Sequence, residues 1–208
     1  MRTLASAALV TDALLFQATL ADGDSSSLPA LLEHLRIAVS PMRVRLQPAL
    51  SLDQKVLYVY LHFEYRAVIE QAWVHKLEAA LQTQEAYLEN VRVSRLEKVF
   101  APPCASADEM PAFHYVVEMD PAAGHMPELA QWYDTEHMPG LAQVPGCVHA
   151  ARFLNHDHGP LSLACYDLVD QETLGSPPWL AVRNTNWSSC MRPHFTNTIR
   201  TMFTPIAG

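Results

Sequence analysis

The chain has 208 residues, of which half are hydrophobic and 17% are charged, a balance typical of compact folded proteins. Its 14 Lys and Arg against 22 Asp and Glu give a net charge of −8, which argues against nucleic-acid and anionic-membrane partners. No stretch approaches the roughly 18 apolar residues of a membrane-spanning helix. The length accommodates two domains of about 100 residues each or one larger domain.

The first half of the chain is predicted to fold in the order strand, helix, strand, strand, helix, strand. Apolar and polar residues alternate in 42–50, while 56–64 is an aromatic, β-branched run typical of a more buried strand. Ser27 is placed to cap the first helix, and an apolar stripe that includes Trp73 marks the second. The predicted strands are 13–20, 42–50, 56–64 and 91–100, and the predicted helices are 28–37 and 66–88.

The second half repeats this order after a segment rich in proline and small residues. We predict domains at 1–103 and 112–208, with 104–111 as the linker. Weak residue matches between the halves, such as Tyr60 with Tyr166, favour a tandem repeat. The predicted elements of the second half are strands at 112–119, 147–155, 161–169 and 198–206, a helix at 125–137 and a broken helical region at 172–192.

The two halves differ in their charged and titratable residues. Residues 1–108 hold 10 Lys and Arg against 12 Asp and Glu, and residues 109–208 hold 4 against 10. All four basic residues of the second half are arginines, and seven of the ten histidines lie there. The four cysteines are scattered without a CxxC motif, which predicts reduced thiols and a cytoplasmic location. Candidate functional groups therefore concentrate in the second half.

The run from Trp132 to Gly146 is the most specific pattern in the chain. Hydrophobic residues recur before it at helical spacing, and Pro139 with Gly140 is predicted to end the helix. His137 then lies in the last helical turn. An alternative role for His137 is to cap the helix C-terminus, where the helix dipole favours a cation.

Residues three and four apart share a helix face, which predicts that Asp134 and Tyr133 lie beside His137. An imidazole flanked by a carboxylate and a phenol is a candidate general base. The predicted catalytic residues are therefore His137, Asp134 and Tyr133.

The motif W-Y-x-x-E-H-x-P-x-L-x-x-V-P-G, followed by a strand containing Ala151, Arg152 and Phe153, resembles the dimeric α+β barrel superfamily, in particular its EthD-like members. The chain departs from their His-x-Pro-Leu pattern because Gly140 separates Pro139 from the following leucine. The resemblance implies an α+β fold of two ferredoxin-like βαββαβ units, whose antiparallel sheets pack as a pseudo-dimeric barrel within one chain. Homo-oligomers are a further option.

The resemblance also implies a small-molecule enzyme that needs no cofactor, as in monooxygenases, isomerases and decarboxylase-like proteins of this superfamily. The substrate would be a small, largely apolar carbonyl or phenolic compound. Its predicted contacts are Trp132, Phe153 and His149. By strand alternation His149 and Arg152 face opposite sides, so at most one of them lines a given pocket. The alternative is a non-catalytic barrel that binds a small molecule or only assembles.

No cofactor motif is visible in the sequence. The seven glycines include no G-x-G-x-x-G phosphate loop, which argues against a nucleotide cofactor. The turn containing His156, Asp157 and His158 is the densest group of metal-ligand residue types, but no further ligands converge on it by spacing. We therefore predict no metal site.

Overall fold

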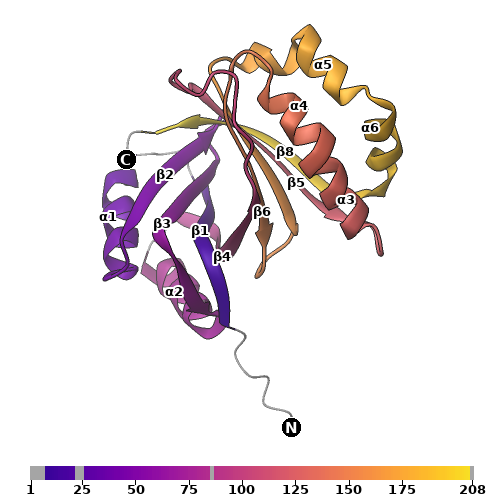
Figure 1. Ribbon diagram of the computed structural model, residues 1–208. Helices are drawn as coiled ribbons and strands as arrows, with labels where there is room; N and C mark the ends of the chain where they lie inside the picture. The colour runs from indigo at the N-terminus through magenta and orange to yellow at the C-terminus, as the bar shows by residue number, and fades with distance from the viewer. Residues whose placement is uncertain (1–7, 22–25, 85–86, 207–208) are drawn as a thin grey trace. The chain divides into compact units, whose positions relative to one another are not determined.

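A computed structural model describes residues 8–21, 26–84 and 87–206 (Figure 1). The chain divides into two compact units. Unit 1 comprises residues 1–97, 155–158 and 205–208, and unit 2 comprises residues 98–154 and 159–204. The connection 155–158, which joins two strands of unit 2 in sequence, thus belongs to unit 1. The predicted linker 104–111 and its flanking domain boundaries stay a prediction.

Unit 1 has the predicted order βαββαβ, and its antiparallel sheet has the strand order β2-β3-β1-β4. Much of the predicted loop 21–27 lies outside the described residues. The elements are β1 (Ala8–Leu20), α1 (Leu28–Ala38), β2 (Val44–Ser51), β3 (Val56–Glu70), α2 (Gln71–Gln84) and β4 (Leu88–Phe100).

One boundary of unit 1 differs from the sequence-based expectation. Residues 66–70 were expected to begin the second helix, but they extend β3. Ala67 to Glu70 pair with Ala8 to Thr11 of β1, so strand pairing satisfies the backbone groups that a helix would otherwise satisfy. The β-branched Val68 and Ile69 also suit an extended conformation. The helix α2 therefore begins only at Gln71.

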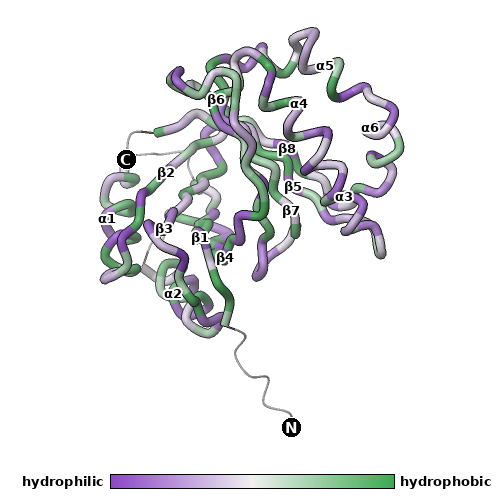
Figure 2. The backbone as a smooth tube through the Cα atoms, viewed as in Figure 1, coloured by the Kyte–Doolittle hydropathy of each residue, from purple (hydrophilic) through white to green (hydrophobic). Residues whose placement is uncertain are grey.

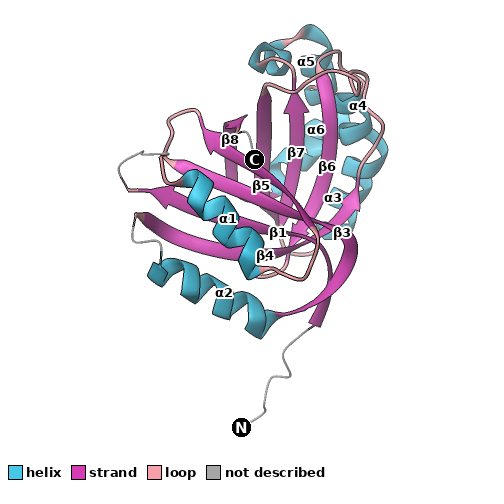
Figure 3. Cartoon of the chain, turned by 90° about the vertical axis from the view of Figure 1, so that its left-hand side faces the viewer, coloured by secondary structure: helices cyan, strands magenta, loops and turns pink. Residues whose placement is uncertain are grey.

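The core of unit 1 lies between its sheet and the two helices α1 and α2 (Figures 1 and 3). Hydrophobic residues recur along these strands and helices (Figure 2). Leu31 of α1 and Leu81 of α2 are fully buried in the same cluster as Leu14 and Phe16 of β1. Burying each such side chain stabilises the fold by about 1.5–3 kcal/mol. Ser27 precedes α1 as predicted, although its side chain makes no capping hydrogen bond.

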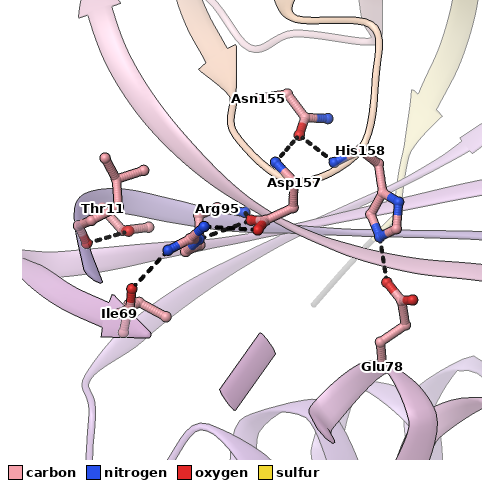
Figure 4. A network of polar contacts seen from close by, with 8 residues as sticks. Thr11, Ile69, Glu78, Arg95, Asn155, Asp157 and His158 are labelled. Atoms are coloured by element: carbon pink, nitrogen blue, oxygen red, sulfur yellow. Dashed lines mark hydrogen bonds and ion pairs between the residues drawn. The ribbon is translucent and has the colours of Figure 1, made fainter. Parts of the chain in front are cut away.

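A buried ion pair holds the connection 155–158 in unit 1 (Figure 4). Arg95 Nε and Nη2 donate to the Asp157 carboxylate at 2.9 Å each, and Arg95 Nη1 donates to the carbonyl of Ile69 at 3.0 Å. The two charged side chains are 3% and 0% exposed. Because the guanidinium and the carboxylate meet through two hydrogen bonds, each charge has the partner that burial requires.

The neighbouring histidines of this turn also have carboxylate partners. His156 Nε2 lies 3.0 Å from Glu97 Oε2, and His158 Nε2 lies 2.6 Å from Glu78 Oε2. The three residues that resemble a metal-ligand motif in sequence thus point to three different partners. Within the described ranges, no group of three or more His, Cys, Asp and Glu side chains could hold a metal ion.

Unit 2 also follows the predicted order, and its antiparallel sheet has the strand order β8-β5-β7-β6. Its predicted broken helical region consists of short helices and 3-10 turns. The elements are β5 (Phe113–Pro121), α3 (Met126–Trp132), the π-helical turn η1 (Tyr133–His137), α4 (Met138–Ala142), β6 (Cys147–Asn155), β7 (Ser162–Leu168), η2 (Gln171–Gly175), α5 (Pro177–Arg183), α6 (Asn186–Met191), η3 (Arg192–His194) and β8 (Phe195–Pro205).

The helices of unit 2 pack on its sheet and bury large aromatic residues (Figure 3). Trp132 at the end of α3 and Trp179 of α5 are each 2% exposed, and they belong to one cluster with Ala150 of β6 and Tyr166 of β7. This cluster forms the wall of the candidate site. Among the described residues, no helix combines the length and the hydrophobicity needed to cross a membrane.

Candidate functional site

The helix that carries His137 does not end where its sequence suggests. Pro139 and Gly140 were expected to terminate it, but the chain passes through the π-helical turn η1 and continues as α4 to Ala142. The Met138 N–H donates to the Tyr133 carbonyl, five residues earlier. Proline lacks an N–H and its ring clashes with the carbonyl four residues before it, so a wider turn ahead of Pro139 accommodates the ring without breaking the helix. The prediction of a helix end at this point is wrong.

Gly140 has a packing role rather than a helix-ending one. A Cβ atom built on Gly140 would lie 2.9 Å from Val182 Cγ1 of α5, closer than side chains normally approach. The glycine therefore lets α4 and α5 pack closely. His137 consequently lies inside a continuous helical segment, not at its end, so a helix-capping role for His137 is wrong as well.

A pocket in unit 2 opens beside η1; its enclosed volume is about 50 Å³, and the figure of about 510 Å³ for all empty space includes the open solvent at its mouth. Its walls are mainly aromatic and its rim carries cations. The lining residues are Tyr115, Val117, Trp132, Tyr133, His137, Leu141, Tyr166, Trp179, Arg183, Ser188, Arg192, Phe195 and Arg200. Apolar concave sites with a few converging polar groups are the usual form of small-molecule sites.

His137 is held in this pocket by aromatic rings. Its imidazole stacks on Trp132 with 4.1 Å between ring centroids, and the Tyr133 ring lies edge-on to it at 5.5 Å. Burial, together with the nearby cations Arg183 and Arg192, lowers the pKa of His137 from 6.5 to about 3. The imidazole is therefore neutral at physiological pH.

Three polar atoms of the pocket residues have no hydrogen-bond partner in the described part of the chain. They are Nδ1 of His137, Nε1 of Trp132 and the hydroxyl of Tyr166, all buried. Unpaired buried polar groups cost about 1–3 kcal/mol each, and most buried polar groups in folded proteins are paired. Burial also raises the pKa values of Tyr133 and Tyr166, so both phenols stay protonated. Because all three unpaired atoms are buried, they lie beneath the aromatic wall of the pocket and not on its accessible surface.

Three exposed arginines line the same pocket: Arg183 at the end of α5, Arg192 at the start of η3 and Arg200 on β8. Arg200 hydrogen-bonds the Tyr115 side chain. None of the three forms an ion pair with a carboxylate of the described residues. Arg192 also donates to the backbone carbonyls of Ser188 and Arg183. Cations without a carboxylate partner around an aromatic pocket favour a ligand that carries or acquires negative charge.

The fourth arginine of this half of the chain lies against the pocket wall. Arg152 of β6 is 2% exposed, and its guanidinium carbon lies 5.6 Å from the centroid of the Tyr133 ring. Arg152 Nη2 donates to Asp134 Oδ1 at 2.8 Å. Asp134 was predicted to orient His137, but this hydrogen bond turns its carboxylate to Arg152.

The structure brings together some of the predicted site residues and separates others. Trp132, Tyr133 and His137 line the pocket, whereas His149 and Phe153 are not among its lining residues. The His149 side chain is 55% exposed, and its Nδ1 lies 3.6 Å from Asp167 Oδ2. Phe153 is buried, with 3% of its surface exposed. The functional roles of all these residues stay predictions.

Sequence reasoning missed Arg183, Arg192 and Arg200 as pocket residues. The signal that could have found them was present, since the acidic second half keeps only four basic residues and all are arginines. Their spacing along the chain does not show that they converge, because they lie on three different elements. Only the fold brings them to one pocket.

No family model matches the chain, and no curated protein matches its sequence. Several solved structures share its fold. An anthrone oxidase-like protein has 9% sequence identity with a TM-score of 0.63, over 97% of this chain and 95% of that one. A candidate monooxygenase of Fusobacterium nucleatum has 9% identity and a TM-score of 0.60, over 95% and 94%. A chlorite dismutase of Candidatus Nitrospira defluvii has 14% identity and a TM-score of 0.52, over 94% and 92%.

These similar structures belong to the dimeric α+β barrel superfamily. At such low identities the likeness concerns the fold alone. The predicted fold class is confirmed: a mixed α+β chain with antiparallel strands and helices, similar over nearly its whole length to proteins of this superfamily.

Proposed function

We propose that the protein is an enzyme that removes a proton from a small aromatic carbonyl or phenolic compound bound in the unit 2 pocket. The observation that carries this proposal is the position of the neutral imidazole of His137. It lies between aromatic rings and three arginines that have no carboxylate partner among the described residues. The names of the similar structures, anthrone oxidase-like protein and candidate monooxygenase, favour an enzyme of this kind. Membership of the EthD-like group, the intrachain pairing of the two sheets and a cytoplasmic location stay predictions.

In the proposed reaction the substrate proton passes to His137. Because Nδ1 is buried, Nε2 is the nitrogen left to meet a ligand. The electron pair of the broken C–H or O–H bond stays on the substrate as an enolate or phenolate. The oxygen of this anion lies toward Arg183, Arg192 and Arg200. Isomerisation, elimination and oxygenation can all begin with this step.

The arginines are essential to the energetics of this transfer. Moving a proton from a phenol with a pKa of about 10 to a base with a pKa of about 3 costs about 9–10 kcal/mol, and this cost is the energy gap to be offset. Hydrogen bonds to charged groups contribute about 1.5–3 kcal/mol each when they are shielded from solvent, and less for exposed side chains such as these three arginines, so they offset part of this gap. The new anion also offsets the repulsion that Arg183 and Arg192 exert on the imidazolium, which lowers the gap further.

The alternative function is a non-catalytic site for an aromatic anion. The low pKa of His137 favours it, because a weak base is a poor proton acceptor unless the bound anion raises its pKa. Both functions require binding in the pocket, and only the first requires proton transfer. The two functions therefore predict different effects of replacing His137 on ligand binding and on the exchange of substrate protons with solvent.

The test is hydrogen–deuterium exchange of the acidic C–H groups of anthrone and 1-tetralone in heavy water, followed by NMR. The wild-type protein is expected to accelerate this exchange, and His137→Gln to reduce the acceleration about 10²- to 10⁴-fold, the usual contribution of a general base. His149→Gln, which lies outside the pocket lining, is the matched control and should keep the wild-type rate. Equal rates in wild type and His137→Gln would contradict the role of His137. Binding of these ketones without accelerated exchange would favour the alternative.

A further inference from the structure

The segment before β5 is fastened to the turn that leads into β6, and each carries a cysteine. Cys104 belongs to the first segment and Cys147 begins the strand. Four hydrogen bonds join the two segments: Gln143 Nε2 to the Pro103 carbonyl at 2.9 Å, the Ala105 N–H to the Ala142 carbonyl at 2.8 Å, the Ser106 N–H to the Cys147 carbonyl at 3.0 Å, and the Gly146 N–H to Ser106 Oγ at 2.9 Å. These bonds hold the two segments that carry the cysteines side by side.

The two thiols are neighbours, and each donates to a backbone carbonyl: Cys104 Sγ to Pro102 at 3.7 Å and Cys147 Sγ to His149 at 3.8 Å. Cys104 is half-buried and reachable from solvent, whereas Cys147 is fully buried. The neighbouring Cys147 thiol, with a smaller contribution from the charge of His149, lowers the pKa of Cys104 to about 7. The same contact and burial raise the pKa of Cys147. One thiol of the pair is thus an accessible thiolate near neutral pH, and the other is a protected thiol.

We propose that Cys104 and Cys147 form a reversible disulfide, with a peroxide as the oxidant. The Cys104 thiolate attacks the peroxide, the O–O bond breaks, and the sulfur becomes a sulfenic acid with release of one water. Cys147 then attacks that sulfur, the S–O bond breaks, and its thiol proton leaves with the hydroxide as a second water. One peroxide and two thiols give one disulfide and two waters.

The difference between the two cysteines suits this order of steps. Cys104 can react first because the thiolate, not the thiol, is the nucleophile. When Cys104 has become a neutral sulfenic acid, its negative charge no longer raises the pKa of Cys147; burial still does, so Cys147 gives up its proton as it attacks. This redox site goes beyond the proposed function, because neither cysteine lines the aromatic pocket. The remaining two, Cys165 and Cys190, are a buried strand residue and an exposed helix residue.

The first test treats the reduced full-length protein with one equivalent of hydrogen peroxide, blocks free thiols with iodoacetamide and maps the peptides without reduction. The expected product is a Cys104–Cys147 cross-linked peptide that dithiothreitol removes. In Cys147→Ala, Cys104 should stop at a sulfenic acid that dimedone traps, and in Cys104→Ser, Cys147 should remain a thiol. Cys190→Ser is the matched control and should form the cross-link as in wild type. Oxidation confined to Cys190, or absence of the cross-link in the wild type, would overturn the proposal.

The second test measures the rate at which iodoacetamide alkylates Cys104 as a function of pH. The rate should rise through a midpoint near pH 7, against about 8.5 for a free cysteine. Cys147→Ala should move this midpoint upward, because it removes the neighbouring thiol that lowers the pKa of Cys104, whereas Cys190→Ser should leave it in place. A midpoint that does not respond to Cys147→Ala would show that the thiols do not act as a pair.

Discussion

Each unit buries one arginine almost completely, and the two differ in how they are paired. Arg95 of unit 1 uses Nε, Nη1 and Nη2 in hydrogen bonds to Asp157 and a backbone carbonyl. Arg152 of unit 2 has Nη2 on Asp134, while Nε and Nη1 have no partner among the described residues. A fully paired buried charge suits a structural role, and an incompletely paired one beside a pocket suits a functional role. This difference places the candidate site in unit 2.

The largest expected effect is on stability, and it separates the two buried arginines. Asp157→Asn leaves Arg95 buried without a countercharge and weakens three hydrogen bonds, so we expect a loss of about 3–5 kcal/mol in the free energy of unfolding. Asp134→Asn weakens one hydrogen bond of a carboxylate that is 34% exposed, and should cost about 1–2 kcal/mol. Urea unfolding measures both. Equal losses in the two variants would remove the distinction between the arginines.

The next largest expected effect is a pH dependence of stability, caused by His137 of unit 2. Above pH 6.5 His137 is neutral in the folded and unfolded chain, and it contributes no pH dependence. As the pH falls from 6.5 toward 3, the unfolded chain binds a proton that the folded chain does not, and stability falls by up to about 1.4 kcal/mol per unit. When the pH is lowered from 8 to 5, the free energy of unfolding should therefore fall by about 2 kcal/mol more in the wild type than in His137→Gln.

Unfolding curves at several pH values test this expectation, with the exposed His75→Gln in α2 as the control. A pH-independent difference between wild type and His137→Gln would show that the folded protein protonates His137 as readily as the unfolded chain does.

A smaller effect is expected at the rim of the pocket. Arg183→Gln removes an exposed cation that has no carboxylate partner among the described residues, and it should weaken binding of 4-nitrophenolate at pH 8 about five- to tenfold. The exposed Arg36→Gln of α1 is the matched control in unit 1 and should leave the affinity unchanged. Added salt should reduce the difference in 4-nitrophenolate affinity between wild type and Arg183→Gln, because salt screens exposed charges. A loss of the same size in Arg36→Gln would mean that net charge, not the pocket, governs binding.

Much of the fold was predictable because its strands carry their own periodic patterns. The order βαββαβ in each half follows from apolar alternation and turn residues, as in the strand 44–51. Residues 66–70 were mispredicted because their pairing with β1 depends on a segment distant in sequence, and the helix end after His137 was mispredicted because a π-helical turn accommodates Pro139. Local sequence carries no signal of a distant strand or of a widened turn.

The candidate site was predictable only in part, for a related reason. Trp132, Tyr133 and His137 are close in sequence, so one motif identifies them together. The pairing of Asp134 with Arg152 joins a helical turn to a strand, and the arginine rim joins three elements. Residues that converge only through the fold give no pattern of spacing. Charge composition indicated which half holds them, but not where.

The most direct test of the central claim uses the indole N–H signals of the four tryptophans, assigned by single Trp→Phe substitutions and followed by NMR. Trp132 and Trp179 line the unit 2 pocket, while Trp73 packs on the core of unit 1. On titration with 4-nitrophenolate or anthrone, the Trp132 and Trp179 signals should shift with one common dissociation constant and the Trp73 signal should stay in place. Saturable shifts of Trp73 with no change at Trp132 and Trp179 would contradict a site in unit 2.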